Sequence, residues 1–418
     1  MSENTIALPN PVLNEFWVRP QDAIHADLDL LRPRGPVFLA EPEIPPEIPL
    51  PQGPGTWVLT SMADILHVSK NPQTFSSAKG ITVGDQPIEF VEFFSSMIAM
   101  DDPRHAKLRR IVSAGFTPRM LAKLDESVQA LAASIVDDIK GRGEVDFVVD
   151  VAAALPLKIV TDLMGLPDSE YQFVFDRTNI ILGAGDPEYV PEGTDIVTAI
   201  LTAGAELAQL MDELATSKKG GDGTDLTSIL VNTELADDQL SHADLASFFI
   251  LLVVAGNETT RNAISWGLDY LTKHPDQRAI WANDFEGVAP TAVEEIVRMA
   301  SPVTYMRRTV TEDTVVGGQE MAAGDKVSMF YLAANRDPAV YADPHVFNVL
   351  RNPNPHVGFG GPGPHFCLGA HLARREITVM FRELFKQLPD IRSTSEPDYL
   401  ASSFIHGVKH LKAEFTPR

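Results

Sequence analysis

The stretch HVGFGGPGPHFCLGAHLARRE, residues 356–376, holds the only cysteine of the 418-residue chain, Cys367. Four glycines and two prolines stand among the nine residues before it. Glycine adopts backbone conformations that are barred to other residues and lets a flat ligand approach closely. From Cys367 onward apolar residues recur with helical spacing, so we predict a helix over 367–387. The sulfur would then lie at a helix N-terminus, where the dipole and free amides favour a thiolate.

Two interpretations of this thiol compete. A lone cysteine usually fills a hydrophobic core, because cysteine is among the most often buried residue types. A core position needs no nest of glycines, however, and a glycine-rich loop that presents a thiolate at a helix start is what an axial haem ligand requires. The single cysteine also excludes an intramolecular disulfide and any zinc or iron–sulfur site built from several cysteines.

The composition is that of a soluble globular protein, with 44% hydrophobic and 22% charged residues. Lys and Arg number 34 against 57 Asp and Glu, and this net charge of −23 argues against binding nucleic acid or anionic membranes. The N-terminus lacks the basic and apolar segments of a secretory signal. The longest apolar run, 248–256, is far shorter than the ~20 residues of a membrane-spanning helix. We therefore expect a cytoplasmic protein without a membrane anchor.

Helical periodicity dominates the chain, and it predicts helices over 119–140, 152–164, 195–217, 242–273, 290–299 and 367–387. Short β-like runs at 36–40 and 56–60 flank the proline-rich stretch 41–55. That stretch is either a domain linker or a long loop joining two strands, and the flanking runs favour the loop. A second strand pair is predicted near 314–331, with two glycines at 317–318 as its turn. The sequence thus predicts one domain, 1–418, mainly α with small peripheral β-sheets.

The sequence AGNETTRN, residues 255–262, is a poor design for the middle of the predicted helix 242–273. Gly256 costs roughly 1 kcal/mol against alanine, and Thr259 competes for backbone carbonyls. A kink packed in the core would explain these residues without a function. The functional alternative is a widened groove for dioxygen, in which Thr259 and Glu258 arrange protons and water. Helical spacing places this pair on one face with three apolar residues, Leu251, Val254 and Ala255.

Two charged pairs have helical spacing but little specificity on their own. Glu295 and Arg298 stand three residues apart in EEIVR, and His105 and Arg109 stand four apart in MDDPRHAKLRR. Such pairs are ordinary on the solvated faces of helices. They become informative only together with the two segments above.

Taken together, these segments resemble the cytochrome P450 superfamily over roughly residues 55–415. The cysteine loop of that family has the pattern Phe-Gly-x-Gly-x-His/Arg-x-Cys-x-Gly, which is matched by Phe359, Gly363, His365, Cys367 and Gly369. Phe359 lies one residue farther from the cysteine than the pattern allows, which indicates an insertion within 360–362. AGNET is similar to the family's oxygen-binding helix motif, Ala/Gly-Gly-x-Asp/Glu-Thr.

The resemblance implies a haem b cofactor with Cys367 as its axial thiolate ligand. It also implies the family's triangular helical prism, in which the haem lies between the oxygen-binding helix and the helix after the cysteine loop. Phe359 and Gly256 would contact the cofactor. Cationic donors for the haem propionates would be His105, Arg109, Arg308 and His365. A buried structural triad would consist of Glu295, Arg298 and Arg351.

The activity that the resemblance implies is hydroxylation of a hydrophobic small molecule with O2. Cys367 would favour O–O cleavage, and Thr259 and Glu258 would take part in proton delivery. Electrons would come from a separate ferredoxin or flavodoxin with its reductase. Candidate docking residues on the cysteine side, which a merely solvated set of charges explains as well, are Arg104, Lys107, Arg110, Arg374 and Arg375.

The segment 81–99, rich in Ile, Val and Phe, falls where the first substrate-contact region of the family lies, and we expect it to be a loop. Apolar lining suits a hydrophobic ligand that is oriented by few polar contacts. Further contacts are predicted from residues 303–306, in particular Val303, and from Phe404 and Ile405.

Two substrate classes remain open. GNETTRN and FIHGVKHLKAEF resemble actinobacterial enzymes that hydroxylate the terminal methyl of sterol side chains and methyl-branched lipids. SPVTYMRRT and GGQEMAAGDKV resemble bacterial terpene-alcohol hydroxylases. We prefer the sterol or branched lipid. A peroxide-using enzyme, or a non-catalytic haem-thiolate protein, is the remaining alternative, and the retained Glu258–Thr259 pair argues against both.

Overall fold

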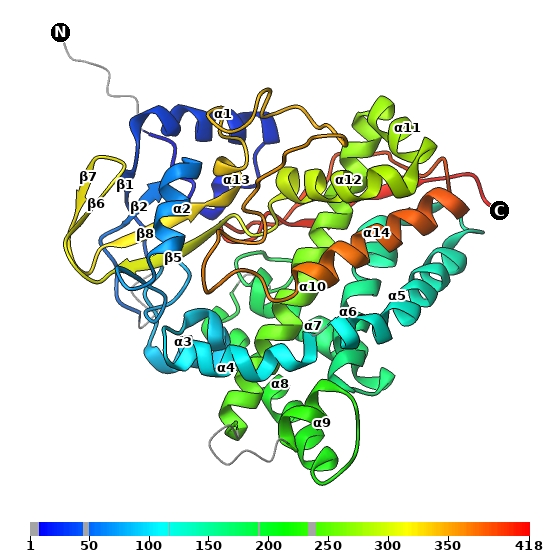
Figure 1. The fold of residues 1–418 in the computed structure, drawn as a ribbon, viewed down its shortest axis with the longest axis horizontal. Coiled ribbons are helices and arrows are strands. Elements are labelled where there is room, and N and C mark those ends of the chain that lie inside the picture. Colours follow the sequence, from blue (N-terminus) through cyan, green and yellow to red (C-terminus); the bar gives the residue numbers. More distant parts are fainter. Residues whose placement is uncertain (1–7, 45–49, 117, 191–192, 233–239) are drawn as a thin grey trace.

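The computed structural model describes residues 8–44, 50–116, 118–190, 193–232 and 240–418, with the backbone alone for 114, 115 and 118–124. Helices dominate the described chain, as the sequence predicted (Figure 1). The helices are α1 (Gln21–Leu31), α2 (Met62–Lys70), α3 (Ile88–Ser95), α4 (Arg104–Val112), α5 (Pro118–Ile139), α6 (Ala154–Met164), α7 (Tyr171–Gly183), α8 (Ile196–Lys218), α9 (Leu226–Val231), α10 (His242–Lys273), α11 (Pro275–Asn283), α12 (Phe285–Ala300), α13 (Tyr331–Ala334) and α14 (Ala370–Gln387).

The largest sheet has five strands in the order β1-β2-β8-β5-β3. Strands β2 and β8 are parallel, and the other neighbours are antiparallel. Because β1 and β2 pair directly, the segment 41–55 connects neighbouring strands, as the sequence favoured. The strands are β1 (Val37–Leu39), β2 (Thr56–Leu59), β3 (Phe75–Ser76), β4 (Glu144–Asp146), β5 (Tyr305–Val310), β6 (Thr314–Val316), β7 (Gln319–Met321), β8 (Lys326–Phe330), β9 (Arg392–Ser393), β10 (Asp398–Tyr399), β11 (Val408–His410) and β12 (Lys412–Glu414).

The predicted strand pair near 314–331 is confirmed as the hairpin of β6 and β7. Its two-residue turn consists of Gly317 at φ +55° and Gly318 at φ +82°. Two consecutive positive φ angles match the twist that a tight hairpin requires, and glycine adopts them without steric cost.

Helix α10 forms the centre of the molecule. It starts with a capping box between Ser241 and Asp244, and most of its side chains are buried. Figure 1 shows it passing between the strands and the outer helices α5 and α14. By length and composition α10 is apolar enough to cross a membrane, but 61% of its most apolar window is buried inside the protein. It is therefore a core helix, as its short apolar run predicted.

The predicted helix 242–273 coincides with α10, and α5, α6 and α8 lie within two residues of their predicted bounds. Three predictions about the elements were wrong, one of them the start of α14, which is Ala370 rather than Cys367. Helix α12 begins at Phe285 rather than 290, because Asp284 caps it and Pro290 is accommodated inside. The segment 81–99 was expected to be a loop, yet it contains α3, whose apolar side chains pack against neighbouring helices.

Candidate active site

The cysteine loop is closed by a backbone hydrogen bond from Cys367 N–H to the Phe359 carbonyl, at 3.0 Å. Between these residues the loop lies against the end of α2. A Cβ at Gly363 would come to 2.4 Å from the carbonyl oxygen of Ser69, and one at Gly361 would meet the Ser69 hydroxyl. These glycines therefore admit the α2 backbone, whereas the sequence suggested only that they admit a flat ligand.

The helix expected to begin at the cysteine begins three residues later, at Ala370, after Gly369 as its N-cap. The Cys367 side chain is accessible to solvent, although protein atoms surround its other sides. This burial raises the pKa of the thiol, while the Gly369 N–H and the charges of Arg109 and Arg374 act to lower it. The protein alone thus favours a neutral thiol, contrary to the expected thiolate. A metal that binds the thiolate would displace its proton.

Phe359 faces the start of α14 and the middle of α12. The guanidinium of Arg374 lies 4.3 Å from the centroid of its ring, and the ring of His356 is 5.8 Å away. Glu294 joins both partners, accepting from Arg374 Nη2 at 2.9 Å and lying 2.8 Å from His356 Nε2. Burial alone would raise the pKa of Glu294, but these partners outweigh it and lower the pKa to about 2. The sequence analysis missed Glu294, because only tertiary structure reveals its partners.

The three residues expected to form a buried triad lie together. Arg298 donates to both carboxylate oxygens of Glu295, at 2.7 and 2.8 Å, and both side chains are fully buried. Arg351 Nε lies 3.1 Å from the same carboxylate, and the Asn354 amide donates to it at 3.0 Å. A buried charge is stable only when its hydrogen-bonding capacity is used in this way.

A cavity of about 410 Å³ lies between α4 and the cysteine loop, lined in part by His105 and Arg109. The ring of His105 lies 4.3 Å from that of His365. His105 Nδ1 is 3.3 Å from Asp102, and His365 Nε2 is 3.1 Å from the hydroxyl of Ser77. The second ring nitrogen of each histidine is buried without a partner among the described residues.

Two arginines add positive charge beside these rings. Arg308 of β5 is buried, donates to the Arg307 carbonyl at 2.7 Å, and has no carboxylate partner in the part of the chain that is described. Arg109 Nη2 donates at 2.6 Å to the carbonyl of Phe366, next to the cysteine. Buried cations without counter-charges are costly, so this set fits a ligand that carries carboxylates.

The sequence predicted four cationic donors, which is wrong for the two histidines in the protein alone. Burial lowers the pKa of His105, and burial with the nearby charges of Arg308 lowers the pKa of His365 to about 2. Both rings are therefore neutral near pH 7 and act as N–H donors. Ser77 was missed, because 288 positions separate it from His365 and no local pattern links them.

Ala255 and Thr259 are accessible in the middle of an otherwise buried helix: Ala255 is exposed and Thr259 half-buried. The helix is continuous here, and Thr259 Oγ1 donates to the Ala255 carbonyl at 2.7 Å. Leu368, the residue after the cysteine, packs into the same apolar cluster as Leu251 and Val254. The predicted face of α10 and the cysteine loop therefore contribute side chains to the same apolar cluster.

Glu258 departs from that face. Its side chain is 1% exposed and pairs with Arg261, whose Nη1 donates to Asn179 of α7 at 3.0 Å. Burial raises the pKa of Glu258, and the Arg261 charge acts in the opposite direction. Helical spacing grouped Glu258 with Thr259, but the pairing with Arg261 turns its carboxyl toward α7.

Gly256 packs against α6 in this structure. A Cβ at this position would lie 2.7 Å from Cγ2 of Val160. The observed contact is therefore one between two helices, whereas contact with a cofactor, which the sequence analysis expected, stays a prediction.

The predicted substrate contacts divide into accessible and buried side chains. Val254, Ala255, Val303 and Phe404 are at least partly accessible. Ile405 is 2% exposed and forms a β-bridge with Val303, and its contact with substrate stays a prediction. Phe404 and Met306 pack on an apolar cluster from segment 81–99, made of Ile81, Val91 and Ala99.

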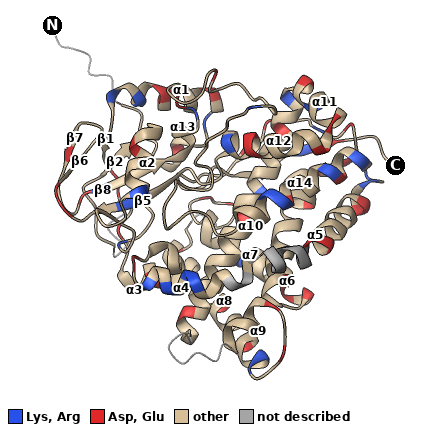
Figure 2. Cartoon of the chain, viewed as in Figure 1, with Lys and Arg blue, Asp and Glu red and all other residues tan. Residues whose placement is uncertain are grey.

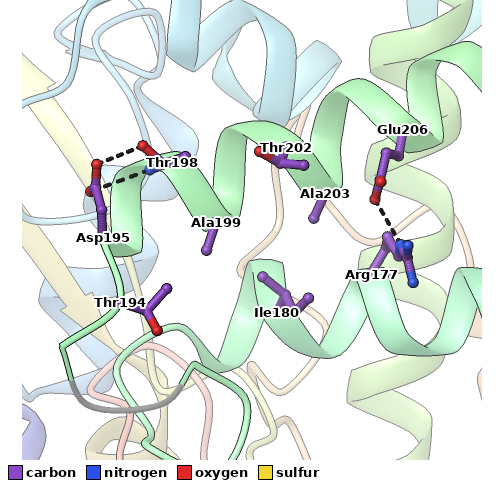
Figure 3. Close-up of a pocket in the computed structure, with 9 residues that line it drawn as sticks. All are labelled: Arg177, Ile180, Thr194, Asp195, Thr198, Ala199, Thr202, Ala203 and Glu206. Carbon is purple, nitrogen blue, oxygen red and sulfur yellow. Dashed lines mark hydrogen bonds and ion pairs between the residues drawn. The ribbon is translucent and has the colours of Figure 1, made fainter.

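A second cavity, of about 390 Å³, lies between α7 and α8. Figure 3 shows Arg177 paired with Glu206, at 2.8 Å, and Asp195 bonded to Thr198 at the start of α8. None of its lining residues was predicted as a site residue.

Comparison with known proteins agrees with this geometry. The family profile described as Cytochrome P450 matches residues 288–389. The chain is 47% identical over 401 residues to a methyl-branched lipid omega-hydroxylase of Mycobacterium tuberculosis, covering 95% of this chain and 92% of the relative. A cytochrome P450 of Mycobacterium marinum, solved in complex with pseudoionone, is similar with a TM-score of 0.92 at 39% identity, covering 99% of this chain and 100% of that one. The chain belongs to the cytochrome P450 family.

This P450 is also 37% identical over 376 residues to a steroid C26-monooxygenase of Rhodococcus jostii, covering 89% of this chain and 78% of the relative. It is a monooxygenase, and the family implies a haem-thiolate centre, dioxygen and a hydrophobic substrate. The residues fit such a group. Cys367 offers an accessible thiol, and the orphaned nitrogens of His105 and His365 lie with Arg109 and Arg308 where carboxylates would be bound.

Proposed function

We propose that this P450 hydroxylates the terminal methyl group of a methyl-branched lipid or sterol side chain, in the cytoplasm, with residues 1–418 as one catalytic domain. The observation that carries the proposal is the 47% identity, over 95% of the chain, to a relative named methyl-branched lipid omega-hydroxylase. Relatives named steroid C26-monooxygenase, at 35–37% identity, add sterols to the substrate class.

The lining of the site supports a long aliphatic substrate. Val254 and Ala255 of α10 are apolar and accessible, and Phe404 and Met306 stand against the apolar side chains of segment 81–99. Such surfaces offer a hydrophobic chain dispersion contacts but few hydrogen bonds, so shape rather than polarity would select the oxidised end.

We infer that the cofactor is haem b and that Cys367 is its axial ligand. Cys367 is the only thiol of the chain, and it is exposed at the glycine-rich loop. Arg109 and Arg308, with the N–H groups of His105 and His365, would bind the two propionates. When bound, the haem supplies the oxygen activation that no side chain provides.

The protein's own residues hold and move protons. The hydroxyl of Thr259, now bonded to the Ala255 carbonyl, can rotate to donate toward the accessible side of α10. Burial raises the pKa of the Glu258 carboxyl, which favours a protonated side chain that can act as a proton donor. Glu258 and Thr259 are adjacent in sequence but lie on different sides of α10. A proton would therefore pass between them by rotation of a side chain or through a bridging water.

We infer that electrons come from a ferredoxin, or a flavodoxin, with its reductase. Figure 2 shows Lys and Arg along α4 and α14, around the cysteine loop. Three of the candidate docking residues have intramolecular partners: Arg104 with Glu92, Arg375 with Asp125, and Arg374 with Glu294. Lys107 is exposed without an ion-pair partner among the described residues. Lys107 is therefore the most informative docking residue to change, and Lys107→Glu should weaken ferredoxin binding in a salt-dependent way.

A terpene or terpene alcohol is the second candidate substrate. It is favoured by the 39% identical structure from Mycobacterium marinum, which was solved with pseudoionone and covers the whole chain. The same apolar lining accommodates either class, so binding measurements decide between them.

The deciding experiment is a spin-shift titration of the purified holoprotein with isostearic acid, cholesterol and pseudoionone. We expect tight low-to-high spin changes with isostearic acid or cholesterol and weaker ones with pseudoionone. Turnover with NADH, ferredoxin reductase and ferredoxin should then give a terminally hydroxylated product. A preference for pseudoionone would move the enzyme to the terpene class. Product formed only with hydrogen peroxide, and none with NADH, ferredoxin reductase and ferredoxin, would overturn the oxygenase proposal.

The ligand assignment is tested separately with Cys367→Ser. This variant should lose the carbonyl spectrum that is typical of a thiolate ligand, because serine oxygen is a weaker donor to iron. Retention of that spectrum would show that Cys367 is not the ligand.

A further inference from the structure

The turn of α10 from Asn257 to Arg261 buries polar atoms without partners in the described part of the chain. Asn257 is 0% exposed, and neither its amide nitrogen nor its amide oxygen is hydrogen-bonded. Glu258 Oε1 and Arg261 Nε are also buried and unpartnered. Buried polar groups in native proteins are paired with protein or ordered water, so four such atoms in one turn require an explanation.

The positions of these residues allow the four atoms to share a partner. Arg261 follows Asn257 by four residues and Glu258 by three, and such residues are neighbours on a helix surface. The other oxygen of Glu258 is bound by Arg261 Nη2, and Arg261 Nη1 donates to Asn179. A buried water requires two to four polar partners, and the remaining donors and acceptors of this turn supply that number.

Asn257 differs from the other asparagine of the same helix. The Oδ1 of Asn262 accepts from the backbone N–H of Val408 at 2.9 Å, so Asn262 ties α10 to β11. Asn257 has no such contact with the described residues. An apolar side chain of the same shape would fill its position without the desolvation cost of an amide, so packing does not account for asparagine here.

We propose that Asn257 anchors a buried water between α10 and α7, and that this water completes the hydrogen bonding of Glu258 and Arg261. Asn257 is then a positioning residue, because it acts through the water and touches neither substrate nor cofactor. The inference rests on the proposed function, in which Glu258 supplies protons. When Glu258 gives up its proton, the water donates one to Glu258 Oε1 and is reprotonated in turn from solvent.

Helix α7 would form the outer wall of this water site. Its Asn179 holds Arg261, and the Arg261 charge also acts on the hydroxyls of Tyr171 and Tyr189. Burial raises the pKa of Tyr171 to about 12 and raises that of Tyr189 as well, against the effect of Arg261. Both phenols stay protonated at neutral pH, so they are possible donors along the path from solvent.

The test compares Asn257→Leu with Asn257→Ser in the holoenzyme, with isostearic acid, ferredoxin reductase and ferredoxin. Leucine has the shape of asparagine but binds no water, whereas serine leaves a hydroxyl and room for a second water. We expect Asn257→Leu to lower the product formed per NADH about threefold, release the difference as hydrogen peroxide, and increase the solvent isotope effect on product formation. Asn257→Ser should recover at least half of the lost coupling.

Asn262→Leu is the matched control, since it should lower the thermal midpoint while the product formed per NADH stays unchanged. A crystal structure of the holoenzyme should show a water within hydrogen-bond distance of the Asn257 amide. An Asn257→Leu enzyme that is more thermostable than the parent and equally well coupled would overturn the inference, as would a dry site in the crystal. Failure of the proposed function looks different: the parent enzyme itself would show no spin shift or product.

Discussion

The charged network around Glu295 of α12 and the turn 257–261 of α10 are both buried, but they are built differently. Around Glu295 the carboxylate oxygens are bound by Arg298, Arg351 and Asn354. In the α10 turn, by contrast, Asn257 and one oxygen of Glu258 lack any partner among the described residues. The Glu295 network uses its hydrogen-bonding capacity within the protein, whereas the turn 257–261 leaves part of its capacity without a partner among the described residues.

This difference distinguishes a carboxyl group with a structural role from one that is suited to proton transfer. A carboxylate held by several protein donors is fixed in position and in charge, so it stabilises the fold and cannot exchange protons. A carboxyl with an unpartnered oxygen, and with its pKa raised by burial, holds its proton more readily and can pass it on through that oxygen. Glu295 is therefore part of the scaffold of this P450, whereas Glu258 has an oxygen unpartnered among the described residues, as its proposed role in proton delivery requires.

The largest effect is expected from breaking the satisfied network. Arg298→Met should destabilise the protein by about 3–5 kcal/mol, because it leaves Glu295 buried with its two strongest donors removed. Chemical denaturation of the purified variant would measure this loss, together with the yield of folded protein. Arg382→Met is the control, since Arg382 pairs with the exposed Glu286 and such surface pairs contribute about 1 kcal/mol or less. Equal losses for the two variants would contradict the distinction.

A smaller effect is expected at Gly256, beside the unsatisfied turn. Gly256→Ala places a Cβ 2.7 Å from Cγ2 of Val160 and should cost about 1–3 kcal/mol by overpacking. Adding Val160→Ala should recover at least half of this loss, as seen in thermal unfolding. If the double variant stays unstable and binds less haem, then Gly256 contacts the cofactor, as its sequence motif suggested.

The third effect depends on pH and concerns Glu294. Its folded pKa of about 2 lies below the ordinary value of 4.5, so its stabilisation is present above pH 4.5 and disappears as the pH falls through 2. Glu294→Gln should therefore lose about 2 kcal/mol near neutral pH, since the pairing with His356 and Arg374 is lost. The difference in unfolding free energy between parent and variant should shrink steadily from pH 4.5 toward pH 2. A difference that does not change with pH would show that Glu294 is not the titrating group.

The smallest effect on stability is expected at Thr259. Among the described residues its hydroxyl bonds only to the carbonyl one turn earlier, so Thr259→Ala should change the unfolding free energy by less than about 1 kcal/mol. Substrate binding should persist, while a large share of the NADH consumed is lost as hydrogen peroxide. Thr260→Ala, at the buried neighbouring position, should leave coupling intact. A well-coupled Thr259→Ala enzyme would remove Thr259 from the proton path.

The sequence predicted elements well where a pattern is long and local. Helix α10 was placed correctly over its whole length, because apolar periodicity and the Ser241 cap act within the segment itself. The start of α14 was misplaced by three residues, since helical spacing of apolar side chains does not reveal that Cys367 to Gly369 form a turn. Segment 81–99 was taken as a loop, although α3 forms there through packing against other helices.

For the side chains of the candidate site as well, local sequence predicted which residues are present but not the contacts that they make with distant segments. Motif spacing identified Cys367, Glu258 and Thr259, but it grouped Glu258 with the accessible face of α10. Glu258 pairs instead with Arg261, which is bound in turn to Asn179, 82 positions away in the sequence. The histidine rings were expected to be cations, yet burial among arginines keeps the pKa of each one low.

By itself the sequence determined the P450 family, the cysteine, the acid–alcohol pair and the long central helix, since each depends on residue identity and short-range spacing. Only the tertiary structure decided which carboxyls are fully paired and which keep a free oxygen. Those states depend on hydrogen-bond partners brought together from distant segments: Arg351 and Asn354 donate to Glu295, and Asn179 accepts from Arg261. Pairing and burial set the pKa of an ionisable side chain, and neither can be read from the residues next to it in the chain.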